Sequence, residues 1–373
     1  MTVPSRSALP YRRTILIAGG GTGGHLMPAL AIATALQEQA SDVEPVLIGA
    51  TRGVEARILP SRDFRFHLLP TEPIYRRAWW RNIRWPFVAG RLLREVGRVF
   101  ETERPAAVLG TGGYASGPVV WWAARHGVPT AIQEQNAYPG LASRWLSRRV
   151  RHVYLGLPEA RRLLRFGPNT SVFDTGNPIT PPAPGRRSAA AAKFGLDGAR
   201  PVVLVTGGSQ GAHAINRAVA GWLDGGGPGN ADLIWVTGRG TYDEFARYHR
   251  PPQVQVVDFL DPMGDGYAVA DLVVSRSGMI TVAELCAWGL PNILVPLPTA
   301  AADHQTYNAK VLVASGASLL LPQAELTRDR LGEVVAALLS DPVRRKQMGE
   351  QALARGRPQA AREIVSNLLT LIS

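Results

Sequence analysis

A glycine-rich turn that follows a short apolar run appears twice in this chain, once in each half. The first lies in TILIAGGGTGGH at residues 14–25, and the second lies in PVVLVTGGSQGAH at residues 201–213. A run with helical periodicity follows each turn. In such a unit glycine lets a ligand approach the backbone, and the unpaired N–H groups and the dipole of the helix favour an anion. The two copies therefore predict two nucleotide-binding-type units.

Strand-like and helix-like segments alternate along both halves, which is typical of parallel sheets covered by helices on both faces. With 373 residues and 46% apolar content, the chain can bury two cores. We expect an α/β protein with two Rossmann-like parallel-sheet domains facing a cleft, where ligands bind beyond the carboxyl ends of the strands. The expected domains are residues 11–178 and 193–357, with a proline-rich linker at 179–192 and a C-terminal helix at about 358–373 that packs back on the first domain.

The cysteine content and the net charge indicate the compartment and the kind of partner that this protein has. The single cysteine, Cys286, excludes an internal disulfide framework and fits a reducing compartment. We expect no signal peptide, and no run of about eighteen apolar residues predicts a membrane span. The formal net charge is +12, and residues 1–180 hold 23 arginines against 12 acidic residues. This asymmetry favours an anionic partner on the side of the first domain.

Residues 75–87, YRRAWWRNIRWPF, interleave four arginines with three tryptophans. Tryptophan is favoured at the bilayer interface and arginine at anionic headgroups, so this segment predicts contact with an anionic membrane surface. Two alternatives remain: tryptophans packed in a core beside solvated arginines, or stacking on a single-stranded nucleic acid. The other motifs indicate a small nucleotide ligand, and we therefore expect no nucleic-acid partner.

The first glycine turn also matches the dinucleotide pattern G-x-G-x-x-G at residues 19–24. That pattern requires an acidic residue at the end of the second strand to bind the ribose. Here that strand ends in GATR at residues 49–52, and no acidic residue follows until Glu55. A plain NAD site is therefore disfavoured, whereas an NADP site that uses Arg52 stays open. A Walker-type phosphate loop is excluded because no Gly-Lys-Ser/Thr sequence occurs.

Three places carry candidate chemistry, and each has a structural alternative. His25 is suited to act as a general base, or it caps a helix and packs. In the segment 275–284 a helix begins near Ile280 and offers N–H groups to a diphosphate, and Glu284 either accepts the ribose hydroxyls or favours the helix N-terminus. Gln305 and Asn308 can bond sugar hydroxyls or cap a helix. No Asp-x-Asp pair and no metal-ligand spacing occurs, so no metal and no cofactor is expected.

Seven motifs in order make the chain similar to one bacterial family. They are GGGTGGH at 19–25, GTGGYASGP at 110–118, QEQN at 133–136, TGNP at 175–178, GGSQGA at 207–212, SRSGMITVAE at 275–284 and DHQTYNA at 303–309. Together they resemble the MurG family of GT-B glycosyltransferases, which add N-acetylglucosamine to undecaprenyl-diphospho-muramoylpentapeptide (lipid I). The resemblance covers about residues 12–370.

The resemblance implies an inverting, metal-independent transfer from UDP-N-acetylglucosamine to the 4-hydroxyl of the muramoyl sugar, which forms lipid II for peptidoglycan. It also implies a peripheral location at the cytoplasmic face of the cell membrane. By motif, His25 is the candidate base, with Arg276 as a possible aid to the leaving diphosphate. The residues implied to bind substrate are Thr22, Gly23, Gly24, Asn136, Ser209, Leu260, Met279, Ile280, Thr281, Glu284 and Gln305.

The chain departs from the family after its TGNP motif. There the family often has Val-Arg, whereas this chain has Ile179 and Thr180, so only a weaker contact from Thr180 can replace the arginine. Three other functions stay open: a GT-B enzyme with another lipid acceptor, an NADP oxidoreductase, and a non-catalytic nucleotide-sugar sensor. Acceptor specificity would identify the first and a change in cofactor absorbance the second. Donor binding without turnover would identify the third.

Overall fold

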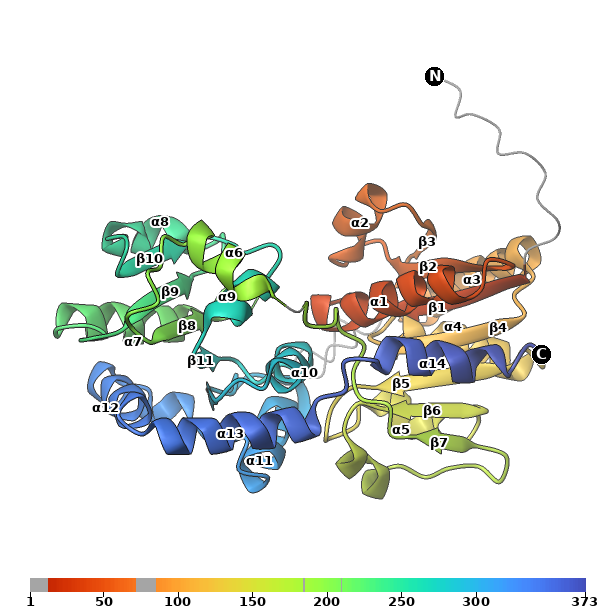
Figure 1. The fold of residues 1–373 in the computed structure, drawn as a ribbon. Coiled ribbons are helices and arrows are strands. Elements are labelled where there is room, and N and C mark those ends of the chain that lie inside the picture. The colour runs from red at the N-terminus through yellow and green to blue at the C-terminus, as the bar shows by residue number, and fades with distance from the viewer. Residues whose placement is uncertain (1–12, 72–84, 184, 209) are drawn as a thin grey trace. The chain divides into compact units, whose positions relative to one another are not determined.

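The computed structural model describes residues 13–71, 85–183, 185–208 and 210–373, and these divide into two compact units (Figure 1). The first unit comprises the described residues up to Gln135 together with Pro139–Ile179 and Gln359–Ser373. The second comprises Asn136–Tyr138 and Thr180–Pro358. Each unit has its own parallel sheet.

The described part of the first unit forms a seven-stranded parallel sheet in the order β3-β2-β1-β4-β5-β6-β7. Its strands are β1 (Arg13–Gly19), β2 (Val43–Ala50), β3 (Arg65–Leu69), β4 (Ala107–Gly112), β5 (Thr130–Glu134), β6 (His152–Leu155) and β7 (Ser171–Phe173). Its helices are α1 (Gly23–Gln39), α2 (Glu55–Ile58), α3 (Trp85–Glu103), α4 (Ser116–Arg125), α5 (Leu141–Leu146) and α14 (Ala360–Leu369), with 3₁₀ turns at Leu59–Ser61 and Pro158–Leu163.

Both faces of this sheet are covered, which explains why its central strands are apolar along their whole length. Alternate residues of β1 point to opposite faces: Ile15 and Ile17 pack with α1 and α14, whereas Leu16 and Ala18 pack with α3 and α4. Figure 1 shows α14 lying beside α1, and the two helices are in contact. The last described helix of the chain thus completes the core of the first unit.

The second unit has a six-stranded parallel sheet in the order β10-β9-β8-β11-β12-β13. Its strands are β8 (Val202–Thr206), β9 (Asp232–Val236), β10 (Val254–Val257), β11 (Leu272–Ser275), β12 (Asn292–Leu294) and β13 (Ser318–Leu320). Its helices are α6 (Arg186–Lys193), α7 (His213–Asp224), α8 (Tyr242–Phe245), α9 (Gly264–Val269), α10 (Met279–Trp288), α11 (His304–Ala314), α12 (Arg328–Leu339) and α13 (Pro342–Arg355), with 3₁₀ turns at Ala246–Tyr248, Ala301–Asp303 and Gln323–Glu325.

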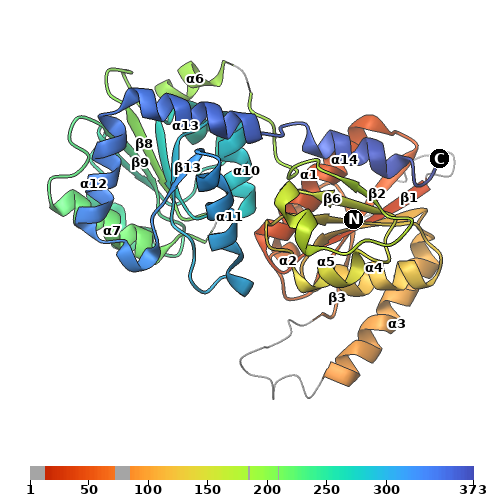
Figure 2. The ribbon, with the colours of Figure 1, turned by 90° about the horizontal axis from the view of Figure 1, so that it is seen from below.

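Helices α7 and α12 share one core with the sheet of this unit, and α10 packs against α13 (Figure 2). Helix α6 begins inside the segment 179–192 that the sequence predicts as a linker, and it ends at Lys193. It begins directly after Gly185, whose φ is +72°, and its RRSAAAAK sequence is rich in alanine, the residue with the highest helix propensity. Lys193 and Arg186 of α6 both bond the Asp265 carboxylate at the start of α9, which anchors α6 in the second unit.

Candidate active site

Each sheet reverses its strand order between two central neighbours, β1 and β4 in the first unit and β8 and β11 in the second. In open parallel sheets ligands bind beyond the carboxyl ends of the strands at such a switch point. The two glycine turns follow β1 and β8, and the segments 113–114 and 276–278 follow β4 and β11. The sequence motifs thus lie at the switch point of each unit.

In the first unit the switch point presents the amino end of α1. Thr22 is the N-cap residue, with an extended backbone, and Gly23 and Gly24 are the first two residues of the helix. Amide groups in a first helical turn lack an intrahelical partner, and Thr22 and Gly24 are exposed to solvent. These three residues are therefore placed where an anion or a sugar oxygen can be bound.

The imidazole of His25 is held by the carboxyl end of β4. Its Nδ1 lies 3.2 Å from the carbonyl oxygen of Thr111, and Gln135 Nε2 donates to the same oxygen over 3.0 Å. Gln135 Nε2 also lies 3.4 Å from His25 Nδ1, but its shorter contact is with the carbonyl of Thr111. A carbonyl only accepts, so in the neutral ring we assign the proton to Nδ1, which makes Nε2 the basic nitrogen. A Cβ at Gly112 would lie 2.6 Å from His25 Nδ1, and Gly112 has a φ of +98°, so glycine is needed there.

Two amides of the first glycine turn are not available to a ligand. Gly21 N donates to both carboxylate oxygens of Glu55, over 2.9 and 3.0 Å, and Gly20 N donates to the carbonyl of Gly112 over 3.4 Å. The sequence-based expectation that the N–H groups of this turn face an anion is therefore wrong for Gly20 and Gly21.

In the second unit the switch point presents the amino end of α10. Gly278 is its N-cap residue and Met279, Ile280 and Thr281 form its first turn. A Cβ added at Gly278 would meet no heavy atom of the described residues within 4 Å, so there is open space beside this N-cap residue. This arrangement suits a phosphate group, because the unpaired amides and the helix dipole act together.

Glu284 lies about one turn further along α10 and is only partly exposed. Its Oε2 accepts a hydrogen bond of 2.9 Å from the hydroxyl of Tyr267, a buried residue of α9. Burial raises the pKa of Glu284 to about 7, against the opposing effect of that hydrogen bond, and burial raises the pKa of Tyr267 well above its usual value. The site thus holds a carboxylate that titrates near neutral pH.

Hydrogen bonds connect helix α11 to the segment before α10. Ser277 Oγ donates to the carbonyl of Gln305 over 2.8 Å, and Gln305 Oε1 accepts from Leu297 N over 2.9 Å. With Oε1 in use, Gln305 can offer its Nε2 to a ligand. Asn308 is fully buried and donates to Ser277 O and to Asn136 Oδ1, over 3.2 and 3.1 Å. The structure therefore brings Asn136, Gln305 and the amino end of α10 into one network within the second unit.

The remaining sequence-predicted residues lie in different surroundings. Thr180 is exposed at the start of the second unit, and Leu260 is 7% exposed after β10, where its side chain packs near Gly266. Ser209 and residues 75–84 lie outside the described residues. Arg276, which the sequence suggests as an aid to the diphosphate, donates instead to the carbonyls of Val295 and Pro296 and to Gln323 Oε1. Burial lowers the pKa of its guanidinium.

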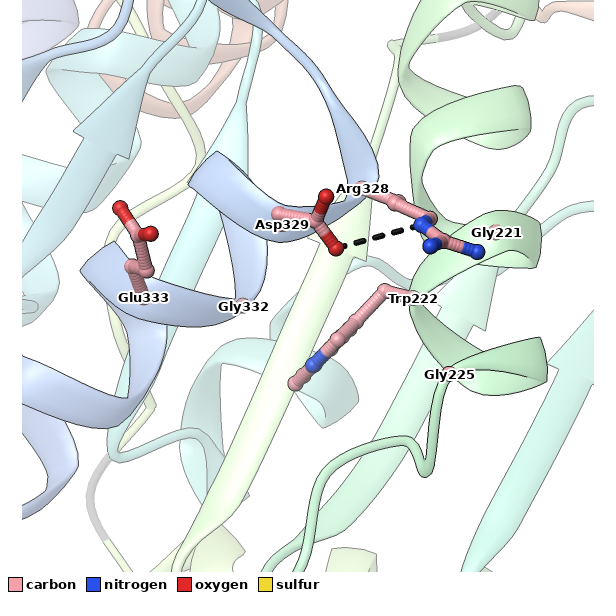
Figure 3. A pocket seen from close by; sticks show the side chains of 7 residues that line it. All are labelled: Gly221, Trp222, Gly225, Arg328, Asp329, Gly332 and Glu333. Atoms are coloured by element: carbon pink, nitrogen blue, oxygen red, sulfur yellow. Dashed lines mark hydrogen bonds and ion pairs between the residues drawn. The ribbon is translucent and has the colours of Figure 1, made fainter.

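A cavity of about 270 Å³ in the second unit lies away from this switch point (Figure 3). Helices α7 and α12 line it with Gly221, Trp222, Gly225, Arg328, Asp329, Gly332 and Glu333. It sits at the carboxyl end of α7, whereas the glycine turn precedes the amino end of the same helix. The cavity is thus at the wrong end of the sheet for the nucleotide site.

Among the residues that the structure describes, no three His, Cys, Asp or Glu side chains group as a metal site. Within the same residues, no helix combines the length and the hydropathy of a membrane span.

Comparisons with known proteins confirm the resemblance and the GT-B class of fold. The family model of the glycosyltransferase family 28 N-terminal domain matches residues 15–155, and that of the family 28 C-terminal domain matches residues 202–364. The crystal structure of MurG from Acinetobacter baumannii matches with a TM-score of 0.77 at 27% identity, covering 96% of this chain and 99% of that one.

Two named relatives match along nearly their whole length. Both are called UDP-N-acetylglucosamine--N-acetylmuramyl-(pentapeptide) pyrophosphoryl-undecaprenol N-acetylglucosamine transferase. The protein from Chlorobium limicola is 37% identical over 96% of this chain and 99% of its own length. The protein from Salinibacter ruber is 38% identical over 96% of both chains. This chain therefore belongs to glycosyltransferase family 28 and, within it, to the bacterial N-acetylglucosaminyltransferases of the MurG family.

Proposed function

We propose that this chain transfers N-acetylglucosamine from UDP-N-acetylglucosamine to the 4-hydroxyl of the muramoyl sugar of lipid I, with inversion, and so forms lipid II. The observation that carries the proposal is the amino end of α10, which combines open space at Gly278, unpaired first-turn amides and a carboxylate one turn further along. These groups match a diphosphate and a ribose. The relatives at 37–38% identity are named for this donor sugar and a pyrophosphoryl-undecaprenol acceptor.

On the donor side, the amides of Met279, Ile280 and Thr281 would bind the diphosphate, and Glu284 would accept the ribose hydroxyls. Leu260 would contact the uracil through its backbone. Gln305, Asn136 and Ser209 would bind the sugar, with Thr180 as a weaker contact.

On the acceptor side, Thr22, Gly23 and Gly24 would line the site. His25 Nε2 would take the proton of the attacking hydroxyl as its oxygen bonds the anomeric carbon. The bond from that carbon to the β-phosphate oxygen breaks on the opposite face, and the negative charge passes to UDP, where the α10 amides stabilise it. Catalysis in this scheme is positional and electrostatic, with no covalent intermediate.

We further propose that the protein binds peripherally at the cytoplasmic face of the cell membrane through residues 75–87. The arginine excess of residues 1–180 supports an anionic surface, and Phe87, at the start of α3, is 84% exposed. Co-sedimentation with vesicles containing anionic lipid, and not with neutral vesicles, is the expected result.

The decisive assay is UDP release from UDP-N-acetylglucosamine, with and without a lipid I analogue, in excess EDTA. Acceptor-dependent release that persists in EDTA is expected. Donor binding without acceptor-dependent release would contradict the proposal and favour another acceptor or a nucleotide-sugar sensor.

A further inference from the structure

A buried carboxylate lies beneath the first glycine turn and belongs to none of the motifs that define the family. Glu55 is the first residue of α2 and is 0% exposed. Its Oε1 accepts from Ala50 N over 2.7 Å, and both of its oxygens accept from Gly21 N over 2.9 and 3.0 Å. The two backbone amides thus hold the buried carboxyl group in one position.

Glycines shape the space around this carboxylate. A Cβ at Gly20, Gly49 or Gly53 would overlap the Glu55 side chain. The cradle thus accepts the carboxylate only because three neighbouring positions lack side chains. In a dinucleotide-binding turn an anionic phosphate sits near these amides and the acid beyond the second strand reaches outward to a ribose. Here the acid turns inward and bonds the glycine turn itself.

The last residue of β4 and the residue after it contact the opposite side of the turn. Gly20 N donates to Gly112 O, and a Cβ at Gly113 would overlap the carbonyl of Gly20. Gly21 has a φ of +96° and is followed within four residues by His25, whose ring bonds the carbonyl of Thr111. The turn is therefore clamped between Glu55 and the residues that orient His25.

We propose that Glu55 is a positioning residue for glycosyl transfer: its carboxylate fixes Gly21, and through it the amino end of α1 and the ring of His25. Glu55 touches no substrate in this scheme and acts only through the turn. The inference rests on the proposed function, because it assigns Glu55 to the acceptor side of the same reaction.

The test compares Glu55→Gln, which keeps the size of the side chain and removes its charge, with Gly53→Ala. The second variant keeps Glu55 and leaves residues 19–25 unchanged, but its Cβ displaces the carboxylate. A matched control is Glu103→Gln. Glu103 is another carboxylate of the first unit, with a 2% exposed side chain, and it pairs with Arg65 and His67 away from the turn.

At a temperature where all variants are folded by circular dichroism, kcat falls about 10- to 100-fold in Glu55→Gln and in Gly53→Ala, because small misplacements of catalytic groups are costly. Affinity for UDP, which the second unit carries, stays within about twofold, as expected for distant sites. Hydrogen exchange of the peptide spanning residues 18–27 accelerates in both variants. Glu103→Gln changes neither kcat nor exchange in this peptide.

Three results would overturn the inference: folded variants with wild-type kcat, a loss of kcat without faster exchange at residues 18–27, or an equal loss in Glu103→Gln. A wild-type protein without acceptor-dependent UDP release would instead refute the proposed function. In that case the exchange contrast would still test the bond between Glu55 and Gly21.

Discussion

Removal of one hydroxyl, in Tyr267→Phe, should shift the pH dependence of UDP binding to higher pH. Tyr267 donates to Glu284 over 2.9 Å, and this bond favours the ionised carboxylate. A hydrogen bond to a charged group is worth about 1.5–3 kcal/mol, and a pKa change of one corresponds to about 1.4 kcal/mol. The pKa of Glu284, raised by burial to about 7, should therefore rise further by roughly 1 to 2 in the variant.

The consequence for binding follows if only ionised Glu284 accepts the ribose hydroxyls. At pH 7 about half of the wild-type carboxylate is ionised, against roughly 1–10% in the variant, so the Kd for UDP increases about 5- to 50-fold. At pH 9 the wild-type group is almost fully ionised and the variant largely so, and the ratio of the two Kd values falls to about 1–2. Because only the charged form of Glu284 binds in this scheme, affinity for UDP decreases as the pH falls through the pKa of this carboxyl group.

Isothermal titration calorimetry with UDP from pH 6 to pH 9 measures this ratio, in which titration of the ligand cancels. Tyr248→Phe is the matched control, because the Tyr248 hydroxyl also donates to a carboxylate, that of Asp224, over 3.0 Å in the same unit. A UDP analogue that lacks the ribose hydroxyls should bind the variant and the wild type equally. A Tyr267→Phe protein weakened by the same factor at pH 7 and pH 9 would refute the role of Glu284 ionisation.

Three further predictions concern single side chains. His25→Gln should retain UDP affinity within about twofold and lose at least about 100-fold in acceptor-dependent UDP release, as for other general bases; retained turnover would refute its role. Thr327→Ala should lower the free energy of unfolding in urea by about 1 kcal/mol, because Thr327 caps α12 by accepting from Arg330 N over 3.1 Å; an unchanged midpoint would contradict this. Asp265→Asn should destabilise the protein at pH 7. Hydrogen bonds from Lys193 and then Arg186 lower the pKa of Asp265, so its contribution is present above the unfolded pKa and disappears in acid; a loss that persists in acid unfolding curves would exclude this linkage.

The sequence predicted the fold well where elements are long and apolar. β1, β2 and β8 are largely apolar runs, and the helices after the glycine turns also contain many apolar residues. β6, β7 and β13 were not predicted, because they are only three or four residues long and gain their stability from the neighbouring strand. Helix α6 was not predicted, because prolines 181 and 182, in the segment before it, favour a linker over a helix.

Only those parts of the candidate site that lie in sequence motifs could be predicted. The turn residues 22–25 and the start of α10 were located correctly on their elements, and their roles stay predictions. Thr111 lies in the GTGGYASGP motif, but its contact with the ring of His25 has no signal in the sequence, because it uses a backbone carbonyl. Glu55 and Tyr267 contact partners 34 and 17 residues away, and only the folded chain brings such side chains together. From the sequence, Glu55 is only an acidic residue that lies too far beyond the second strand to bind a ribose.

The position of α14 in the first unit has a consequence for synthesis. Ile364, Val365 and Leu368 are fully buried there beside α1, yet they are translated after all of the second unit. At about 5–20 residues per second, roughly 10–40 s separate the translation of Ile179 from that of Leu369. During that time one apolar face of the nascent first unit lacks its cover and is open to chaperones. The unit that leaves the ribosome first is thus the one that finishes folding last.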